Sequence, residues 1–514
     1  MTAAADLVLT NAEVHTLESP DETHEAVAIR DGRIVRVGRA YDVELLAGVE
    51  TRVVDCGGSV VLPGFIDAHT HLPMVGRSLV HADLSKANSV GDALDVLQNR
   101  AAEIDGGDEW VLGFGYDEST WDESRYLTRE DLDAVSESTP VVAFREDMHT
   151  AGVNSVVLDR YGDQMPDEGV QTAPSDGTPT GVIVEEAIDV LWEATEPDRE
   201  EMTDLVRAAQ ESATARGVTG VHDMVRGSRA PEVYRDLEAT GELDLRVRIN
   251  YWSDHLDALR EVGLRSNHGD GLVTTGAIKT FTDGSFGGRT AKLSEAYADA
   301  PDETGQWVVE PDDLYELVSD AAAAGYQLSA HAIGGLAIDT VLDAYEATDS
   351  PRTARHRVEH VELASDEAIE RFATLGVVAS VQPNFLKWAD EDGLYADRLG
   401  ERRLRTNRYR DLLDAGVDLA FGSDCMPLDP LLGVDLATNH PDPEQSLTVF
   451  EALRAYTSGS AYAGFDENRV GTITPGKDAD LIVLGESPWE TDSIRDIDVS
   501  MTVVAGRVVF ERDA

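Results

Sequence analysis

The sequence predicts an α/β fold: a parallel (β/α)8 TIM barrel, a small β-sandwich built from both termini, and a subdomain inserted after the first barrel strand. Strand-like apolar runs alternate with helix-like segments through the middle of the chain, which is typical of a parallel barrel. At both ends, apolar and polar residues alternate as in antiparallel strands. The expected domains are a sandwich of residues 1–59 and 463–514 and a barrel of residues 60–462, with an insertion at about 72–210.

The sandwich is predicted from four strand-rich segments. Residues 6–17 and 25–38 lie near the N-terminus, and residues 478–485 and 499–512 have the same pattern near the C-terminus. An Asp-Gly pair inside the second segment favours a tight turn between two strands. Because the two ends resemble each other and differ from the middle, we expect them to form one domain.

Eight apolar runs are expected to be the barrel strands, and helix-like segments such as 311–326 and 365–376 separate most of them. The runs are residues 60–71, 219–224, 245–252, 273–281, 327–334, 357–362, 377–384 and 418–424. The gap at about 72–210 is too long for one crossover helix, so we expect a subdomain there, with strands near 110–117 and 139–147. Its Gly- and Pro-rich segment 166–181 is expected to be a loop or hairpin that could cover a pocket.

The composition excludes several classes of partner. The 514 residues include 98 acidic and 42 basic side chains, for a net charge of -56, which argues against binding nucleic acid or an anionic membrane surface. Two cysteines are too few for a disulfide scaffold. No signal peptide and no apolar run of membrane length is apparent, so we expect a cytoplasmic protein.

The acidic excess also predicts a halophilic protein. Only five lysines are present, and self-repulsion of so much negative charge is tolerable where salt screens it. We expect the charge to lie on the surface and the melting temperature to fall as salt is removed. Thermal unfolding across a salt series checks this, and a melting temperature that is unchanged at low salt would contradict it.

The strongest local motif is His69-Thr70-His71, at the end of the first apolar run. On a strand, residues i and i+2 share a face, so both imidazoles can point at one ion. The alternative is an incidental pair on a surface strand. The position at the end of an apolar run favours a metal site, because a barrel exposes its active face at the C-terminal ends of its strands.

Three later side chains are candidate ligands: His331 in QLSAHAIGG, His360 in HRVEHVE and Asp424 in DLAFGSD. Each has a structural alternative, since Asp424 could cap the following segment and a lone histidine in a strand is often a satisfied core residue. Ligands of a barrel site come from the ends of several strands, so we interpret all three as metal ligands.

Lys279 in GAIKTFTDGS is unusual because it lies in an apolar strand. Burying an ammonium group there is costly, and desolvation lowers a lysine pKa so that the neutral amine becomes available. Reaction with carbon dioxide would give a carbamate, an anion able to bridge two metals. The alternative is a salt bridge to Asp283, a less certain further member of the site.

Weaker polar clusters are also candidates to line a pocket, and each could equally be structural. His222, at the end of the second run, is a candidate hydrogen-bond partner of a ligand. The proposed substrate-binding residues are Asp117, Arg145, His149, Asp283 and Arg289, and Tyr116 and Asp147 lie beside them in the sequence.

Together these residues resemble the amidohydrolase superfamily over nearly the whole chain. The resemblance rests on LPGFIDAHTH, the lysine strand, single histidines on the next two strands, GSD on the last, and the closing GTITPGKDADLIVL. AIKTFTDGSFGGRTA, the long insertion and SVQPNF resemble the branch that contains N-substituted formamide deformylases. The chain differs from that branch at Met148, where a glycine is more familiar.

The resemblance implies a metal-dependent hydrolase of a non-peptide carbon–nitrogen bond. One or two divalent ions are implied, zinc above all, although manganese, iron or cobalt would fit the ligands. The first ion would be held by His69, His71 and Asp424, the second by His331 and His360, and carboxylated Lys279 would bridge them. Asp424 would be the catalytic general base and then acid for a metal-activated water.

Two alternatives stay open: a non-catalytic metal-binding regulator on the same scaffold, and a hydrolase of cyclic amides or esters. The expected partner is a small amide-type substrate, whose identity the sequence does not reveal, and a homo-oligomer is left open.

Overall fold

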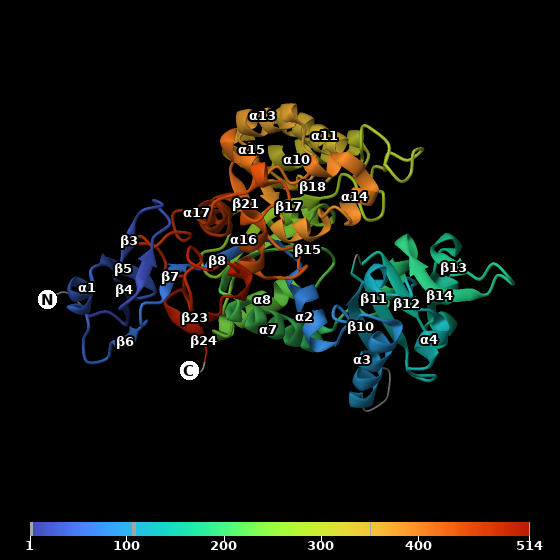
Figure 1. Ribbon diagram of the computed structural model, residues 1–514, viewed down its shortest axis with the longest axis horizontal. Helices are drawn as coiled ribbons and strands as arrows, with labels where there is room; N and C mark the ends of the chain where they lie inside the picture. The colour runs from blue at the N-terminus through green and yellow to red at the C-terminus, as the bar shows by residue number, and fades with distance from the viewer. Residues whose placement is uncertain (1–3, 105–108, 147, 350, 513–514) are drawn as a thin grey trace. The chain divides into compact units, whose positions relative to one another are not determined.

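The computed structural model describes residues 4–104, 109–146, 148–349 and 351–512. The chain divides into two compact units. The larger comprises Met1–Leu72, Gln210–Gly227 and Tyr234–Ala514, and the smaller comprises Pro73–Ala209 and Ser228–Val233. The larger unit contains the barrel and the strands of both termini, and the smaller contains most of the predicted insertion (Figure 1).

Eight parallel strands form the barrel sheet of the larger unit, in the order in which they occur in the chain. They are β8 (Phe65–Thr70), β15 (Val218–Val225), β16 (Arg246–Trp252), β17 (Val273–Thr280), β18 (Leu328–Ala332), β19 (Arg357–His360), β20 (Val378–Val381) and β21 (Leu419–Phe421). After β21, the backbone amides of Ser423 and Asp424 donate to the carbonyl of His69 in the first strand, β8. The predicted (β/α)8 fold is therefore confirmed.

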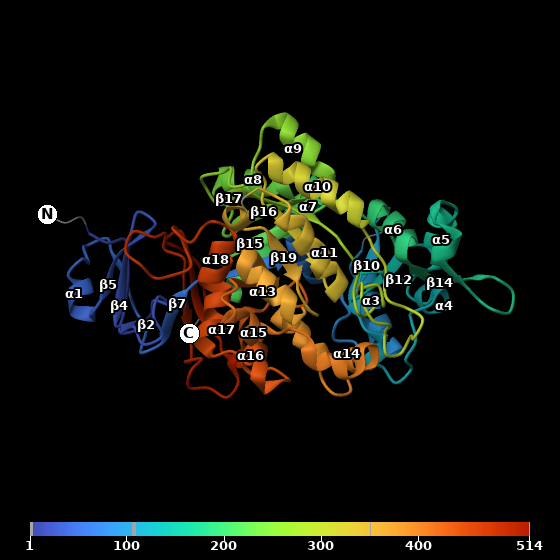
Figure 2. The same ribbon diagram turned by 90° about the horizontal axis from the view of Figure 1, so that it is seen from above.

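Helices cover the outside of the barrel strands, and α10, α11 and α13 lie against one another there (Figure 2). Helix α13 shows why the sequence forms them: Ser365 caps its start, its buried residues recur on one face, and Gly376 ends it with φ 65°. The helices between the later strands include α9 (Leu256–Val262), α10 (Pro311–Ala323), α11 (Gly335–Glu346), α13 (Asp366–Leu375) and α15 (Tyr409–Asp414).

The first apolar run, predicted as one strand over residues 60–71, is two strands. β7 (Val60–Pro63) pairs with β2 and β22, and β8 pairs with β15 of the barrel. Gly64 separates them, and a Cβ there would come within 2.2 Å of the Thr219 side chain. The chain changes sheets at this point because only a glycine permits such a close approach.

Strands from both termini form two sheets of the larger unit. The order of one is β24-β23-β22-β7-β2-β3 and that of the other is β5-β4-β1-β6. One apolar cluster contains residues of both sheets, including Leu9, Ile29, Val61 and Leu481, so the sheets pack face to face. The blue and red strands lie together in Figure 1. Their bounds are β1 (Leu7–Thr10), β2 (Glu13–His15), β3 (Thr23–His24), β4 (Ala26–Arg30), β5 (Arg33–Gly38), β6 (Arg52–Asp55), β22 (Leu481–Leu484), β23 (Val499–Val504) and β24 (Arg507–Glu511).

The smaller unit has its own six-stranded sheet, in the order β13-β14-β12-β11-β10-β9. The predicted strands near 110–117 and 139–147 correspond to β10 and β11, and residue 147 lies outside the described residues. The segment 166–181 contains β13 and the start of β14, which pair as an antiparallel hairpin. The bounds are β9 (Ala82–Asp83), β10 (Val111–Tyr116), β11 (Val141–Arg145), β12 (Thr150–Val153), β13 (Val170–Thr172) and β14 (Pro179–Val184), and α3 (Val90–Glu103) packs on β10.

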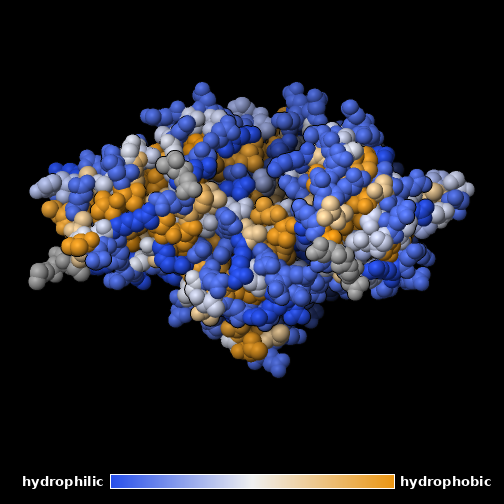
Figure 3. All heavy atoms as spheres, turned by 90° about the horizontal axis from the view of Figure 1, so that it is seen from below, coloured by the Kyte–Doolittle hydropathy of each residue, from blue (hydrophilic) through white to orange (hydrophobic). Residues whose placement is uncertain are grey.

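Acidic side chains are largely excluded from the interior. Among the described residues, seven are buried: Asp67, Asp223, Asp283, Glu359, Glu362, Asp435 and Asp480. The face drawn in Figure 3 is mostly hydrophilic, with smaller apolar patches between. Within the described part of the chain, none of the helices has the length and apolar character needed to cross a membrane.

Candidate metal centre

The closure of the barrel brings Asp424 to the histidine pair. His69 is the second-last residue of β8, and His71 follows the strand directly. Gly422 makes the approach possible, because a Cβ there would lie 2.4 Å from the His69 amide nitrogen. Asp424 then adopts φ 51° and donates its backbone amide to the His69 carbonyl at 2.7 Å. The carboxylate is thus fixed at the C-terminal end of the first strand.

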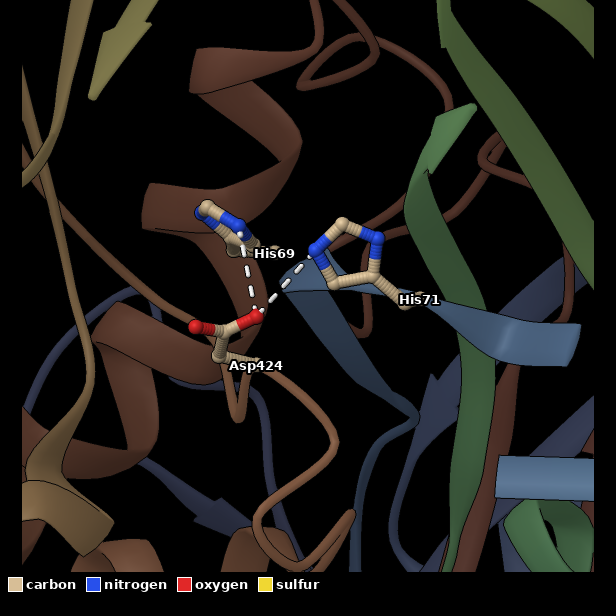
Figure 4. Close-up of side chains that lie close together, drawn as sticks. All are labelled: His69, His71 and Asp424. Carbon is tan, nitrogen blue, oxygen red and sulfur yellow. Dashed lines mark ion pairs between the residues drawn. The ribbon is translucent and has the colours of Figure 1, made fainter. Parts of the chain in front are cut away.

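The three side chains form a set of donors suited to a divalent cation (Figure 4). Asp424 Oδ1 lies 3.6 Å from His69 Nε2 and 3.4 Å from His71 Nε2. One ligand atom from each residue lies within 4.8 Å of the others. Two imidazole nitrogens and a carboxylate oxygen are the ligands that zinc and related ions accept.

The hydrogen bonds made by His69 and His71 leave the Nε2 atom of each ring available to bind a metal. His69 Nδ1 lies 2.7 Å from a carboxylate oxygen of Glu359, and His71 Nδ1 lies 3.1 Å from the carbonyl oxygen of Met224. A carboxylate and a carbonyl only accept hydrogen bonds, so each Nδ1 carries the proton. In the neutral form of each ring, Nε2 then keeps its lone pair, and it faces Asp424. These two nitrogens and the Asp424 carboxylate therefore fit a divalent metal ion.

His331 and His360 extend the site along the next strands. Their ring centroids lie 4.5 Å apart, and the His360 ring lies 5.0 Å from that of His69. His331 Nε2 donates to the Gly284 carbonyl at 3.0 Å, which leaves its Nδ1 as an acceptor. His360 Nδ1 is buried without a hydrogen-bond partner among the described residues. Burial lowers the pKa of His360 to about 3, so its ring is neutral, as a ligand must be.

Lys279 lies on β17 with only 1 % of its surface exposed. Its Nζ is 5.4 Å from the Trp252 ring and 5.5 Å from the Phe281 ring. Among the described residues it has no hydrogen bond or ion pair, so the alternative of a salt bridge to Asp283 is not realised. Burial lowers the pKa of Lys279 to about 8, so a sizeable fraction of the amine is neutral near that pH.

Asp283 and Arg289 are both engaged by protein groups. The buried Asp283 carboxylate accepts the backbone amides of Lys292, Ile333 and Gly334 at 2.7–3.1 Å, and one oxygen lies 3.5 Å from His331 Nε2. It therefore anchors the loops beside His331. The Arg289 guanidinium pairs with Asp299 at 2.6 Å.

The remaining candidates lie in the smaller unit. Arg145 pairs with Asp117 at 2.9 Å and with Glu118 at 2.8 Å. The His149 side chain is 63 % exposed, with Nδ1 3.7 Å from Glu185. Tyr116 is buried in the apolar core of this unit. Nothing in these contacts assigns a substrate-binding role, which stays a prediction.

Met148 has φ 62°, in the left-handed region that a glycine adopts without strain. A glycine, which the resemblance leads us to expect here, would adopt this conformation without strain. Asp147, just before it, lies outside the described residues.

Sequence reasoning missed two site residues, Arg357 and Glu359. Both are fully buried on β19 and form an ion pair at 2.5 Å, and Glu359 holds His69. Burial alone would raise the Glu359 pKa, but the charge of Arg357 and the hydrogen bonds from His69 and Arg357 hold it well below its usual range. Opposite charges at i and i+2 of an apolar strand were the available signal, because they share a face and need partners inside. His222 accepts from Arg357 Nη1 at 2.9 Å, so it contacts this pair rather than a candidate ligand.

The comparisons with known proteins agree with this fold. The model of the amidohydrolase family matches residues 52–510. The putative amidohydrolase YtcJ of Bacillus subtilis is 33 % identical over 96 % of this chain and 97 % of its own. The N-substituted formamide deformylase of Arthrobacter pascens is 29 % identical over 100 % and 99 %. The crystal structure of an uncharacterized metal-dependent hydrolase from Pyrococcus furiosus covers 94 % of this chain and 100 % of its own, with a TM-score of 0.78 and 29 % identity.

Fold, site and comparisons define the class of protein: a metal-dependent hydrolase on a TIM barrel. The chain belongs to the amidohydrolase family. It is a hydrolase that acts on carbon–nitrogen bonds other than peptide bonds.

Proposed function

We propose that this enzyme hydrolyses N-substituted formamides or closely related small amides at a centre of two divalent ions. The observation that carries the proposal is the convergence of His69 Nε2 and His71 Nε2 on the Asp424 carboxylate, with both Nδ1 atoms tied to acceptors. The full-length similarity to an N-substituted formamide deformylase supports the choice of substrate class.

Five side chains and one modified lysine would hold the metals. His69, His71 and Asp424 would bind the first ion, and His331 and His360 the second. The neutral amine of Lys279 would add to the carbon of carbon dioxide and lose one proton, which gives a carbamate between the two ions. Its burial without an ion pair supports this modification, because an anion there would be stabilised by both cations. Zinc suits these nitrogen and oxygen ligands.

Bound divalent ions would supply Lewis acidity at the substrate carbonyl and lower the pKa of a coordinated water. The chain itself moves the proton. Asp424 would take a proton from the attacking water on its carboxylate and pass it to the leaving nitrogen. Although burial would raise the Asp424 pKa, the neighbouring His69 and His71 hold it below its usual range, so the carboxylate starts as a base. The carbon–nitrogen bond breaks to give a carboxylic acid, formate for a formamide, and an amine.

Metal removal tests this function. Dialysis against a chelator should abolish hydrolysis, and zinc should restore it, because the proposed reaction needs a bound ion to lower the pKa of the attacking water. Release of formate and amine from N-substituted formamides should be compared with hydrolysis of N-acyl amino acids, cyclic amides and esters, in parallel samples loaded with zinc, manganese, iron or cobalt. Faster hydrolysis of cyclic amides or esters would show that they, and not N-substituted formamides, are the substrate class. Metal binding with no turnover of any substrate would favour a regulator.

A further inference from the structure

We propose that Glu359, held by Arg357, is a positioning residue that fixes the ring of His69 as a metal ligand. The inference rests on the proposed metal centre and names a part of it outside the ligand set. Glu359 does not touch Asp424 or His71 in the contacts of the described residues. It acts on the metal only through His69.

The Glu359 carboxylate is completely satisfied by four donors. Oε2 accepts from His69 Nδ1 at 2.7 Å and from Arg357 Nη2 at 3.0 Å. Oε1 accepts from Ser329 Oγ at 2.6 Å and from Arg357 Nε at 2.5 Å. The carboxylate therefore cannot rotate away from His69 without losing bonds that no solvent would replace, because the site is buried.

Arg357 in turn is fixed from several strands of the barrel. It donates to the Ala68 carbonyl at 2.5 Å, to Ser380 Oγ at 2.7 Å and to His222 Nδ1 at 2.9 Å. These contacts tie β8, β15, β19 and β20 to one guanidinium. The orientation of Glu359 is thus set by the barrel interior, on the side of His69 away from Asp424.

Which ring nitrogen of His69 carries the proton, Nδ1 or Nε2, decides whether the ring can bind a metal. With Nδ1–H donated to a carboxylate, the Nε2 lone pair faces Asp424. A donor in place of that carboxylate oxygen would reverse the tautomer and put a proton on Nε2. Hydrogen-bond partners of this kind also raise the basicity of a ligating histidine, and their loss costs about 10- to 100-fold in metal affinity.

Two substitutions test the proposal. Glu359→Gln keeps the length of the side chain but offers an amide donor and no charge, and Glu359→Asp keeps the charge for Arg357 but shortens the reach to His69. Zinc and cobalt dissociation constants, measured by competition with a chelator of known affinity, should rise about 10- to 100-fold in both. The visible spectrum of the cobalt protein should change, because a nitrogen ligand is displaced.

Glu362→Gln is the matched control. Glu362 is also a buried glutamate, two residues after β19, but its carboxylate accepts from the Tyr395 hydroxyl and, among the described residues, contacts none of the proposed ligands. Its zinc affinity should stay within about threefold of wild type. The circular dichroism of each metal-free variant shows that it is folded, and Glu359→Asp decides the question if Glu359→Gln does not fold. Wild-type affinity in either folded Glu359 variant would overturn the inference. A wild-type protein that binds no divalent ion would instead refute the proposed function.

Discussion

Replacing Asp424 by Asn is expected to lower kcat by about 1,000-fold while much of the bound metal stays in place. The amide keeps the shape of the side chain and an oxygen that can face the ions, but it cannot accept a proton from water. Metal content per chain and steady-state kcat on the best substrate of the panel provide the measurement.

The control is Asp418→Asn, which changes an aspartate just before β21, at the opposite end of the strand that leads to Asp424. Its kcat should stay within about twofold of wild type. If Asp424→Asn kept more than about a tenth of the wild-type kcat, proton transfer by Asp424 would be ruled out. A complete loss of metal would show that coordination is its main role.

Replacing Lys279 by Ala is expected to remove one of two bound ions and most of the activity, at least about 100-fold in kcat. Without the carbamate, two dications would face each other with no bridging anion, so the second site should lose its affinity. Metal analysis of the purified variant gives the stoichiometry. Acetate should restore part of both properties, because a short carboxylate can occupy the space of the lost group.

Lys86→Ala, at a largely exposed lysine, is the control and should retain the metal content and kcat of wild type. The role of Lys279 would be contradicted by a Lys279→Ala protein that still binds two ions and turns over normally. If acetate restored activity without recovery of the second metal, the carbamate would support turnover without being needed to hold the second ion.

The barrel could be predicted because its strands are short apolar runs separated by helical patterns. The split at Gly64 could not, since β7 and β8 are both buried and read as one apolar run. The pattern of apolar residues predicts that a strand is buried, but it does not indicate which sheet the strand joins. The exchange depends on the close contact between Gly64 and Thr219, which are distant in the sequence.

The candidate ligands could be predicted from the sequence for a similar reason. His69 and His71 lie at the C-terminal end of β8, Asp424 follows β21 closely, and the barrel gathers strand ends at one rim. Glu359 was hidden because a charged residue beside His360 reads as an exposed neighbour until the partners of its carboxylate are known. Arg357 and Ser329 supply these partners from two strands. The pairing with Arg357 lies within one strand and had a signal in the sequence, whereas the pairings with Ser329 and His69 depend on the register between strands, which the sequence of one strand does not contain.

The place of β7 in its sheet has a consequence for how the chain is made. β7 is hydrogen-bonded to β2 on one side and to β22 on the other, and β22 begins only at Leu481. During synthesis, the edge of β7 therefore stays open until residues 481–484 have left the ribosome, although β8 follows β7 directly. A nascent chain that stalls or is cut before Leu481 would present this edge to other chains. The sheet that contains β7 can thus be completed only in a chain that extends at least to Leu484.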